Sequence, residues 1–281
     1  MTLSAGPGPA ATRAAMTDLH NHVIPGVDDG AADREATRAA LQALLDDGVR
    51  RVVATPHVMG SLTLDPAGLA ERLAAIDRAW AVAETIGAEF PGLELGRGSE
   101  IMLDVPEPDL SDARLRLAGG RTVLVEFPFM VIPPYAARPL ARIREHGFSP
   151  LLAHPERYLG VSVAAVEEWR KAGAYIQVNG PALLGKYGDG PRRIAFELLE
   201  LGLVDCLSSD YHARGRPLVA DYRRVLEERG AAEQAELLTA TNPARAVAGE
   251  VPIPVGPMRT RRGAWTRMLS ALRHRPGRSE G

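Results

Sequence analysis

Polar side chains that can bind metal ions recur along this chain at the ends of its predicted β-strands. They stand 25 to 43 residues apart, which is about the length of one strand followed by one helix. Strands that alternate with helices form parallel sheets with right-handed crossovers, so their carboxyl ends lie along the same edge. The positions that define this repeat are His20, His57, Glu100, Glu126, His154, Asn179 and Asp210.

The pattern between these positions predicts the secondary structure. Short apolar or β-branched runs predict strands at 17–22, 49–55, 93–101, 121–126, 149–153, 174–178 and 204–208. Helical spacing predicts helices at 33–47, 66–86, 136–146, 163–171, 192–201, 217–229, 231–238 and 242–248. A closed barrel brings all strand ends to one rim, whereas an open sheet would separate them. We therefore expect an α/β fold, an irregular seven-stranded, TIM-like (β/α) barrel.

The amino-acid composition limits which classes of protein this chain can belong to. The chain has 281 residues, 46% hydrophobic and 24% charged, with a formal net charge of -2, so its charge does not favour a nucleic-acid partner. A single cysteine, Cys206, excludes an internal disulfide and fits a reducing cytosol. There is no apolar run typical of a signal peptide or a membrane helix. We expect a cytoplasmic protein with a disordered leader at 1–15, a barrel at 16–255 and a tail at 256–281.

The tail is basic, and its apolar residues have the spacing of an amphipathic helix. It carries seven arginines, with Trp265, Met268, Leu269 and Leu272 at helical spacing. One interpretation is a helix that contacts an anionic membrane or an acidic kinase segment. The other is a helix that caps the barrel and is followed by a frayed end.

Metal binding explains the polar positions better than surface exposure does. His20 and His22 stand two apart, so in a strand both imidazoles point to the same side, and Asp28 and Asp29 follow. Imidazoles and carboxylates crowd together at low cost only when cations lie between them. The candidates exceed the needs of one ion, which indicates two or three divalent ions, and a set without cysteine suits Mn²⁺, Fe²⁺ or Zn²⁺. The other candidates at strand ends are His57, Glu100, Glu126, His154, Asp210 and His212.

These motifs carry a resemblance to a known family. HNHVIPGVDDG, ATPH, SEI, VEFPF, LAHPERY, QVN and SSDYH, in this order, resemble the polymerase-and-histidinol-phosphatase (PHP) superfamily. They are most similar to the bacterial manganese-dependent protein-tyrosine phosphatases of capsular and exopolysaccharide systems. The resemblance covers residues 16–250, and its most specific parts are DDG, HPERY and SDYH followed by Arg216-Pro217. It implies a manganese enzyme that dephosphorylates a phosphotyrosine protein, a bacterial tyrosine kinase.

The resemblance also implies roles for single residues. One ion would be held by His20, His22, Glu100 and Asp210, a second by Glu100, Glu126 and His154, and a third by Asp29, His57 and His212. Asp28 is the less favoured ligand of its pair. Arg157 and Arg216 would bind the phosphate, which agrees with the bidentate geometry of guanidinium groups. A metal-bound hydroxide would attack directly, without a phosphoenzyme, and Asp210 or His212 would help to move the proton.

Other readings of the chain differ in their chemistry. A cysteine-based tyrosine phosphatase is excluded, because it needs an arginine six residues after its cysteine and that position holds His212. Amidohydrolases commonly use a carbamylated lysine at a strand end, but Lys171 lies in a predicted helix and Lys186 in a loop. A PHP-type exonuclease, a phosphatase of a metabolite such as histidinol phosphate and a non-enzymatic, metal-stabilised docking protein stay open.

Overall fold

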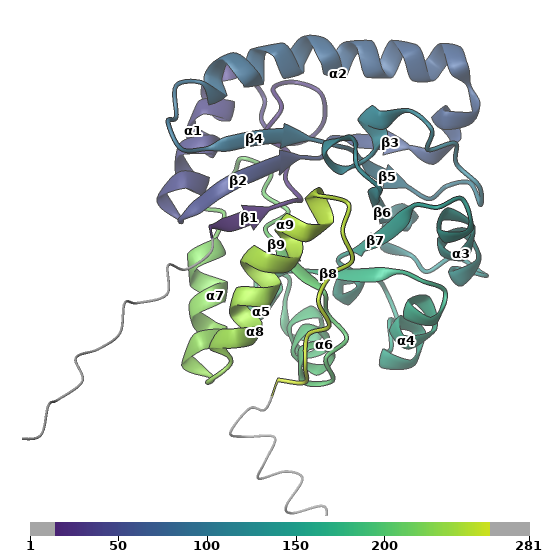
Figure 1. Cartoon of the computed structure of the whole chain (residues 1–281), viewed down its shortest axis with the longest axis vertical. Helices are drawn as coiled ribbons and strands as arrows, with labels where there is room; N and C mark the ends of the chain where they lie inside the picture. The colour runs from purple at the N-terminus through teal and green to yellow at the C-terminus, as the bar shows by residue number, and fades with distance from the viewer. Residues whose placement is uncertain (1–14, 259–281) are drawn as a thin grey trace, which may run out of the picture.

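The computed structural model describes residues 15–258 of the chain. In Figure 1 the strands occupy the centre of this region and the helices lie around them. The predicted leader, apart from Ala15, and the predicted tail beyond Met258 lie outside the described residues. No helix of the described region is long and apolar enough to cross a membrane.

All strand pairs are parallel and fall into two sheets. One sheet has the order β1-β2-β4 and the other the order β3-β5-β6-β7-β8-β9. The strands are β1 (Met16–Asp18), β2 (Val49–Ala54), β3 (His57–Met59), β4 (Glu94–Arg97), β5 (Glu100–Met102), β6 (Thr122–Glu126), β7 (Ser149–Ala153), β8 (Tyr175–Asn179) and β9 (Cys206–Ser208).

The two sheets continue into each other, so these strand segments correspond to the seven predicted strands. The predicted strand at 93–101 is broken between β4 and β5, and β2 is followed by β3, which was not predicted. Pro56, which has no N–H group to donate, lies at one break. Backbone hydrogen bonds bridge the breaks, from Gly98 N to the Ala54 oxygen (2.9 Å) and from Glu100 N to the Pro56 oxygen (3.1 Å).

The strands form a ring, in which β1 and β9 are the two ends of the strand order. The segments that follow these two strands contact each other. Asn21 and Tyr211 form an isolated parallel bridge. His22 N donates to the Tyr211 oxygen (2.9 Å), and Asp210 N donates to the His20 oxygen (2.9 Å). The expected TIM-like arrangement is therefore present, but β1 ends at Asp18 and the predicted strand to His22 was too long.

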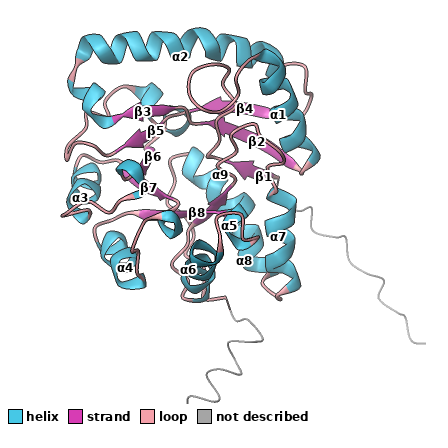
Figure 2. Ribbon diagram, turned by 180° about the vertical axis from the view of Figure 1, so that it is seen from behind, coloured by secondary structure: helices cyan, strands magenta, loops and turns pink. Residues whose placement is uncertain are grey.

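Helices surround the strands, as Figure 2 shows from behind. The predicted helices are confirmed to within a few residues at each end, whereas the short α5 was not predicted. The helices are α1 (Arg34–Asp46), α2 (Pro66–Gly87), α3 (Ala137–Glu145), α4 (Val163–Lys171), α5 (Gly180–Leu183), α6 (Asp189–Glu200), α7 (Val219–Glu228), α8 (Ala232–Glu236) and α9 (Asn242–Val247). Capping explains two starts, since the side chains of Asp33 and Asp65 accept hydrogen bonds from Ala36 N and Ala67 N.

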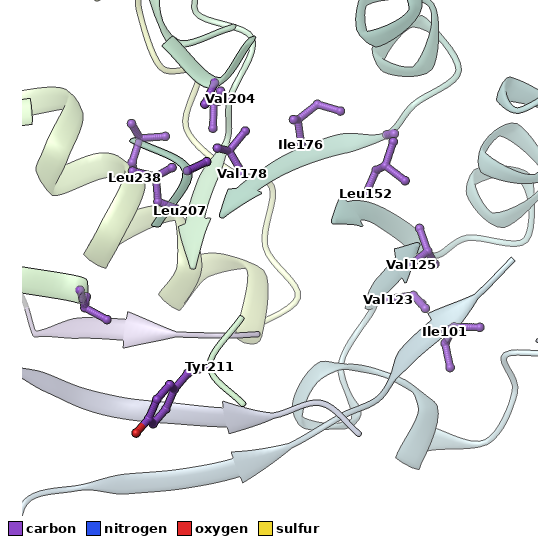
Figure 3. Close-up of a cluster of buried hydrophobic side chains, with 14 of the residues drawn as sticks. Ile101, Val123, Val125, Leu152, Ile176, Val178, Val204, Leu207, Tyr211 and Leu238 are labelled. Atoms are coloured by element: carbon purple, nitrogen blue, oxygen red, sulfur yellow. The ribbon is translucent and has the colours of Figure 1, made fainter. Parts of the chain in front are cut away.

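Strand side chains alternate between two buried apolar clusters. In β6, Leu124 belongs to a small cluster inside the ring of strands, while Val123 and Val125 belong to a larger one against the helices. In β9, Cys206 faces the inner cluster, as a small core residue, and Leu207 the outer one. Figure 3 shows side chains of the outer cluster along successive strands. The inner cluster comprises Leu19, Val53, Leu117, Leu124, Leu151, Ala153, Cys206 and Ala246.

Candidate metal centre

The same alternation points polar side chains inward at the carboxyl ends of the strands. Glu126 stands two residues after Leu124 in β6, and Ser208 two residues after Cys206 in β9, so each continues the inner face of its strand. Gln177 and Asn179 do the same in β8. A buried polar layer therefore follows the inner apolar cluster toward the carboxyl ends of the strands. This polar layer lies at the rim where barrel enzymes place their chemistry.

The structure brings all nine predicted metal ligands together at this rim. Their ligand atoms form four overlapping groups, within each of which the atoms lie within 4.8 Å of one another. The groups are His22, Asp29, His57 and His212; His20, Glu100 and His154; His20, His22 and Asp210; and His57, Glu100 and Glu126.

Glu100, at the start of β5, lies at the centre of this cluster. Its Oε1 is 3.1 Å from His154 Nε2 and 3.2 Å from His20 Nε2. Its Oε2 is 3.1 Å from His57 Nδ1 and 3.4 Å from His22 Nε2. One carboxylate therefore faces four imidazoles, an arrangement that suits a bridging ligand between cations.

Hydrogen bonds on the outer side of three imidazoles define which nitrogen faces the cluster. His20 Nδ1 lies 2.8 Å from Gln177 Oε1, and His212 Nδ1 lies 2.9 Å from the Asp210 carbonyl oxygen. His22 Nδ1 lies 2.9 Å from Asp28 Oδ2. These partners accept hydrogen bonds, so Nδ1 carries the proton and the Nε2 lone pair is directed into the cluster.

Asp28 and Asp29 have different surroundings. Asp28 accepts the hydrogen bond from His22 and is also close to the backbone nitrogen of His57 (3.4 Å). Asp29 Oδ1 lies 3.5 Å from His57 Nε2 and 3.3 Å from His212 Nε2. The geometry favours Asp29 as a ligand and Asp28 as the carboxylate that orients His22, although the ligand assignment stays a prediction.

The electrostatics of the cluster favour cations. Burial lowers the pKa of His20, but the Glu100 and Asp210 carboxylates outweigh burial and raise this pKa to about 9. Burial also lowers the pKa of His57, and the nearby Glu100 and Glu126 carboxylates raise it to about 10. A field that holds protons on imidazoles above neutral pH also attracts divalent ions to the same nitrogens.

The donor set fits a group of divalent ions. Within residues 15–258, buried His20 Nε2, His22 Nε2 and Glu100 Oε2 have no hydrogen-bond partner, which is rare for buried polar atoms. All three are directed into the cluster, where coordination would satisfy them. The chemistry of the donors, imidazole nitrogen and carboxylate oxygen, is that of Mn²⁺, Fe²⁺ and Zn²⁺ sites.

Backbone strain accompanies two of the candidate ligands. His154 directly follows the last residue of β7, and Asp210 follows the last residue of β9 after one intervening residue. Both have positive φ angles, 38° for His154 and 51° for Asp210. Left-handed backbone is unfavourable for residues other than glycine, and such strain concentrates at functional sites. In both cases the turn directs a side chain into the cluster.

The two predicted phosphate-binding arginines differ in position. Arg157 Nη1 donates to Asp210 Oδ2 (2.7 Å), and its guanidinium lies 4.7 Å from the centre of the Tyr187 ring, beside the metal cluster. Arg216 is 64% exposed and pairs with Asp47 (3.1 Å) and Asp221 (3.2 Å). Arg216 lines the hollow that contains Arg157, so its predicted role depends on release from these carboxylates.

Sequence reasoning missed three residues that support the site. Gln177 orients His20, Tyr187 packs against Arg157, and the buried Asp18 accepts hydrogen bonds from Ser208 and Ser209. The motif QVN carried a signal for Gln177, because Gln177 shares a strand face with Asn179. No sequence signal identified Tyr187, which follows a short helix.

The fold and the cluster together define a (β/α)-barrel protein of the metal-dependent hydrolase class. More particularly, the chain belongs to the CpsB/CapC family of capsular polysaccharide synthesis proteins, whose model matches residues 16–248. The resemblance described from the sequence motifs is thereby confirmed.

Named relatives and solved structures agree with this family. The tyrosine-protein phosphatase YwqE of Bacillus subtilis is 28% identical over 200 residues, covering 70% of this chain and 77% of that protein. The tyrosine-protein phosphatase CpsB of Streptococcus pneumoniae is 28% identical over 243 residues, covering 83% and 98%. A crystal structure from work on YwqE and CpsB, described as metal-dependent tyrosine phosphatases, has a TM-score of 0.68 at 25% identity and covers 87% of this chain and 100% of that chain.

Proposed function

We propose that this chain is a metal-dependent phosphatase that hydrolyses phosphotyrosine in proteins. The observation that carries the proposal is the convergence of imidazole and carboxylate lone pairs beside the Arg157 guanidinium. The naming of the relatives YwqE and CpsB as tyrosine-protein phosphatases supports the same substrate. We also propose a bacterial tyrosine kinase of polysaccharide synthesis as the phosphoprotein, in keeping with the capsular description of the family. The cytoplasm is the proposed compartment, because the single, free Cys206 fits a reducing environment.

We further propose that the nine clustered residues hold two or three divalent ions, with Mn²⁺ favoured over Fe²⁺ and Zn²⁺. Divalent ions at such a site supply an acidified water as nucleophile and neutralise charge on the phosphoryl oxygens. Of the ligand sets that the resemblance implies, the third lies within one spatial group and the first is divided between two groups. In the second set, Glu126 groups with His57 rather than with His154. Glu100 is shared between sets and between spatial groups alike.

The protein's own groups would orient the substrate and handle its proton. Arg157, stacked on Tyr187, has donors beside the cluster that can bind phosphoryl oxygens and stabilise their charge. Asp210 Oδ2 already accepts from Arg157 and from Asn179 (2.7 Å each), which limits its freedom to move a proton. Burial lowers the pKa of His212, and the nearby His22 lowers it further. His212 is therefore the better placed of the two proposed proton carriers.

Activity measurements on metal-depleted protein test this function. Purified protein is treated with chelator, and hydrolysis of a phosphotyrosine peptide and of histidinol phosphate is followed with and without added Mn²⁺. We expect the peptide to be hydrolysed only with metal, and faster than histidinol phosphate. Faster hydrolysis of histidinol phosphate would show that a small metabolite, and not phosphotyrosine, is the substrate. Absence of metal-dependent turnover of both compounds would contradict the phosphatase function.

Substitutions test the metal ligands separately. His20→Ala and His154→Ala should each reduce turnover at least about 1,000-fold, because each removes a predicted ligand at the centre of the cluster. The control is His146→Ala, since His146 is exposed at the end of α3 and precedes the start of β7, whereas the cluster lies at the carboxyl ends of the strands. Circular dichroism should show the same fold for all three variants. Full activity in either ligand variant would refute the assignment of that residue.

A further inference from the structure

A hollow of about 530 Å³ opens beside the metal centre and is strongly basic. It includes Asp210 and His212 of the cluster, so it is continuous with the candidate active site. Among the described residues that line it, Asp210 is the single carboxylate. The cationic side chains that line it are Arg157, Lys186, Arg214 and Arg216.

Two of these cations have no carboxylate partner. Arg157 pairs with Asp210, and Arg216 pairs with carboxylates outside the hollow. Over residues 15–258, by contrast, neither exposed Lys186 nor exposed Arg214 forms an ion pair. Arg214 Nη2 donates to the carbonyl oxygen of Asp29 (2.7 Å), which holds its guanidinium at the edge of the metal centre.

The unpaired cations exceed what one phosphoryl group needs. A phosphate dianion at the centre would be neutralised by the bound ions and Arg157. Lys186 precedes Tyr187, the residue that packs on Arg157, and all three residues line the same hollow. Arg214 is held at the edge of the metal centre and Lys186 lines the same hollow, so both can meet residues that flank a phosphotyrosine bound at the centre.

We infer that this basic hollow is a subsite for acidic side chains that flank the phosphotyrosine of the substrate. The inference rests on the proposed function, and it narrows the substrate class to phosphotyrosine in an acidic segment. Lys186 and Arg214 would pair with glutamate or aspartate carboxylates. Such rim contacts act mainly on association, and they weaken as salt screens the charges.

Two peptides of equal length test the subsite. One has glutamate and the other has glutamine on both sides of the phosphotyrosine, and kcat/KM is measured for each with Mn²⁺-loaded, full-length protein. We expect wild-type protein to favour the glutamate peptide about three- to tenfold at low salt, mainly through KM. The preference should fall toward one at about 0.5 M salt. Hydrolysis of phenyl phosphate is measured in parallel as the readout of the proposed function.

The chain offers a matched control for the key residue, because its two lysines are Lys171 and Lys186. Lys186→Glu should abolish or reverse the preference for the glutamate peptide. Lys171 is exposed at the end of α4 and does not line the hollow, so Lys171→Glu makes the same change in net charge and should retain the preference.

The outcomes separate the inference from the proposed function. Equal kcat/KM for the two peptides in wild-type protein, or equal effects of the two lysine substitutions, would overturn the subsite and leave the phosphatase function intact. Hydrolysis of phenyl phosphate without hydrolysis of either peptide would overturn the protein substrate. Absence of turnover on all three compounds would overturn the proposed function itself.

Discussion

Gln177 links candidate ligands on two sides of the barrel. Its side-chain oxygen accepts from His20 Nδ1 (2.8 Å), and its amide nitrogen donates to Asn179 Oδ1 (2.9 Å). Asn179 in turn donates to Asp210 Oδ2 (2.7 Å). Because a glutamine amide is polar but uncharged, this buried chain fixes the tautomer of His20 and the orientation of Asp210 without adding charge to the centre.

Substitution of Gln177 should therefore weaken metal binding more than it weakens the fold. We expect Gln177→Ala to reduce Mn²⁺ affinity about 10–100-fold, because His20 loses the partner that orients it. Gln177→Glu, which retains an acceptor for His20, should recover part of this loss. Affinity is measured by calorimetric titration of the metal-free protein. The control, Gln42→Ala, removes an exposed contact with Asp46 in α1, and a similar loss there would contradict the role of Gln177.

At the scale of the element, the loop that carries Asp28 and Asp29 depends on close backbone packing. The loop returns to the His22 segment, where Ala31 N donates to the His22 oxygen (2.9 Å). A Cβ atom on Gly30 would lie 2.0 Å from that oxygen and 2.4 Å from His22 Cβ. Only glycine permits this approach, which explains the third position of the DDG motif.

Gly30→Ala should displace the loop and impair the metal centre. We expect a loss of roughly 1–3 kcal/mol in the free energy of unfolding, together with weaker metal binding, because Asp28 and Asp29 would move away from their imidazole partners. Urea denaturation and metal titration measure the two effects. Gly190→Ala is the matched control, since a Cβ atom there meets nothing within 4 Å. Wild-type metal affinity in Gly30→Ala would show that the close approach is unnecessary.

At the scale of the whole molecule, a buried carboxylate holds the two ends of the strand order together. Asp18, the last residue of β1, accepts from Ser208 Oγ (2.8 Å), Ser209 N (2.7 Å) and Asn21 Nδ2 (3.0 Å). β1 and β9 form no strand ladder with each other within the described chain. The hydrogen bonds to Asp18 therefore join β1 to the end of β9, next to the backbone hydrogen bonds between the segments that follow these two strands.

Removal of this carboxylate should destabilise the whole barrel. We expect Asp18→Ala to reduce the free energy of unfolding by roughly 3 kcal/mol, because several buried donors lose their acceptor. Asp18→Asn keeps one oxygen and should cost less. The measurement is urea denaturation of metal-free protein, and Asp46→Ala, on the exposed face of α1, is the control. If the control and Asp18→Ala unfold alike, the junction does not depend on Asp18.

Much of the fold and of the site could be predicted from the sequence because both depend on local patterns. Helical periodicity places helix ends to within a few residues, as for the helix predicted at 33–47 and found at Arg34–Asp46. The strand breaks at Pro56 and Ser99 were missed, because an apolar run does not show where a ladder is interrupted. Arg216 was assigned to phosphate from its motif, whereas its partner Asp47 lies 169 residues away and no local pattern connects them.

The sequence by itself determined which residue types follow each strand, and therefore the chemistry that the rim can perform. Parallel strands alternating with helices bring their carboxyl ends together, so the recurrence of histidine and carboxylate predicted a shared site. Only the tertiary structure decided how those residues divide their tasks, such as Asp28 orienting His22 while Asp29 faces His57. Such divisions depend on distances of a few ångströms between segments far apart in the chain, and those distances arise only when the strands pack around a common centre.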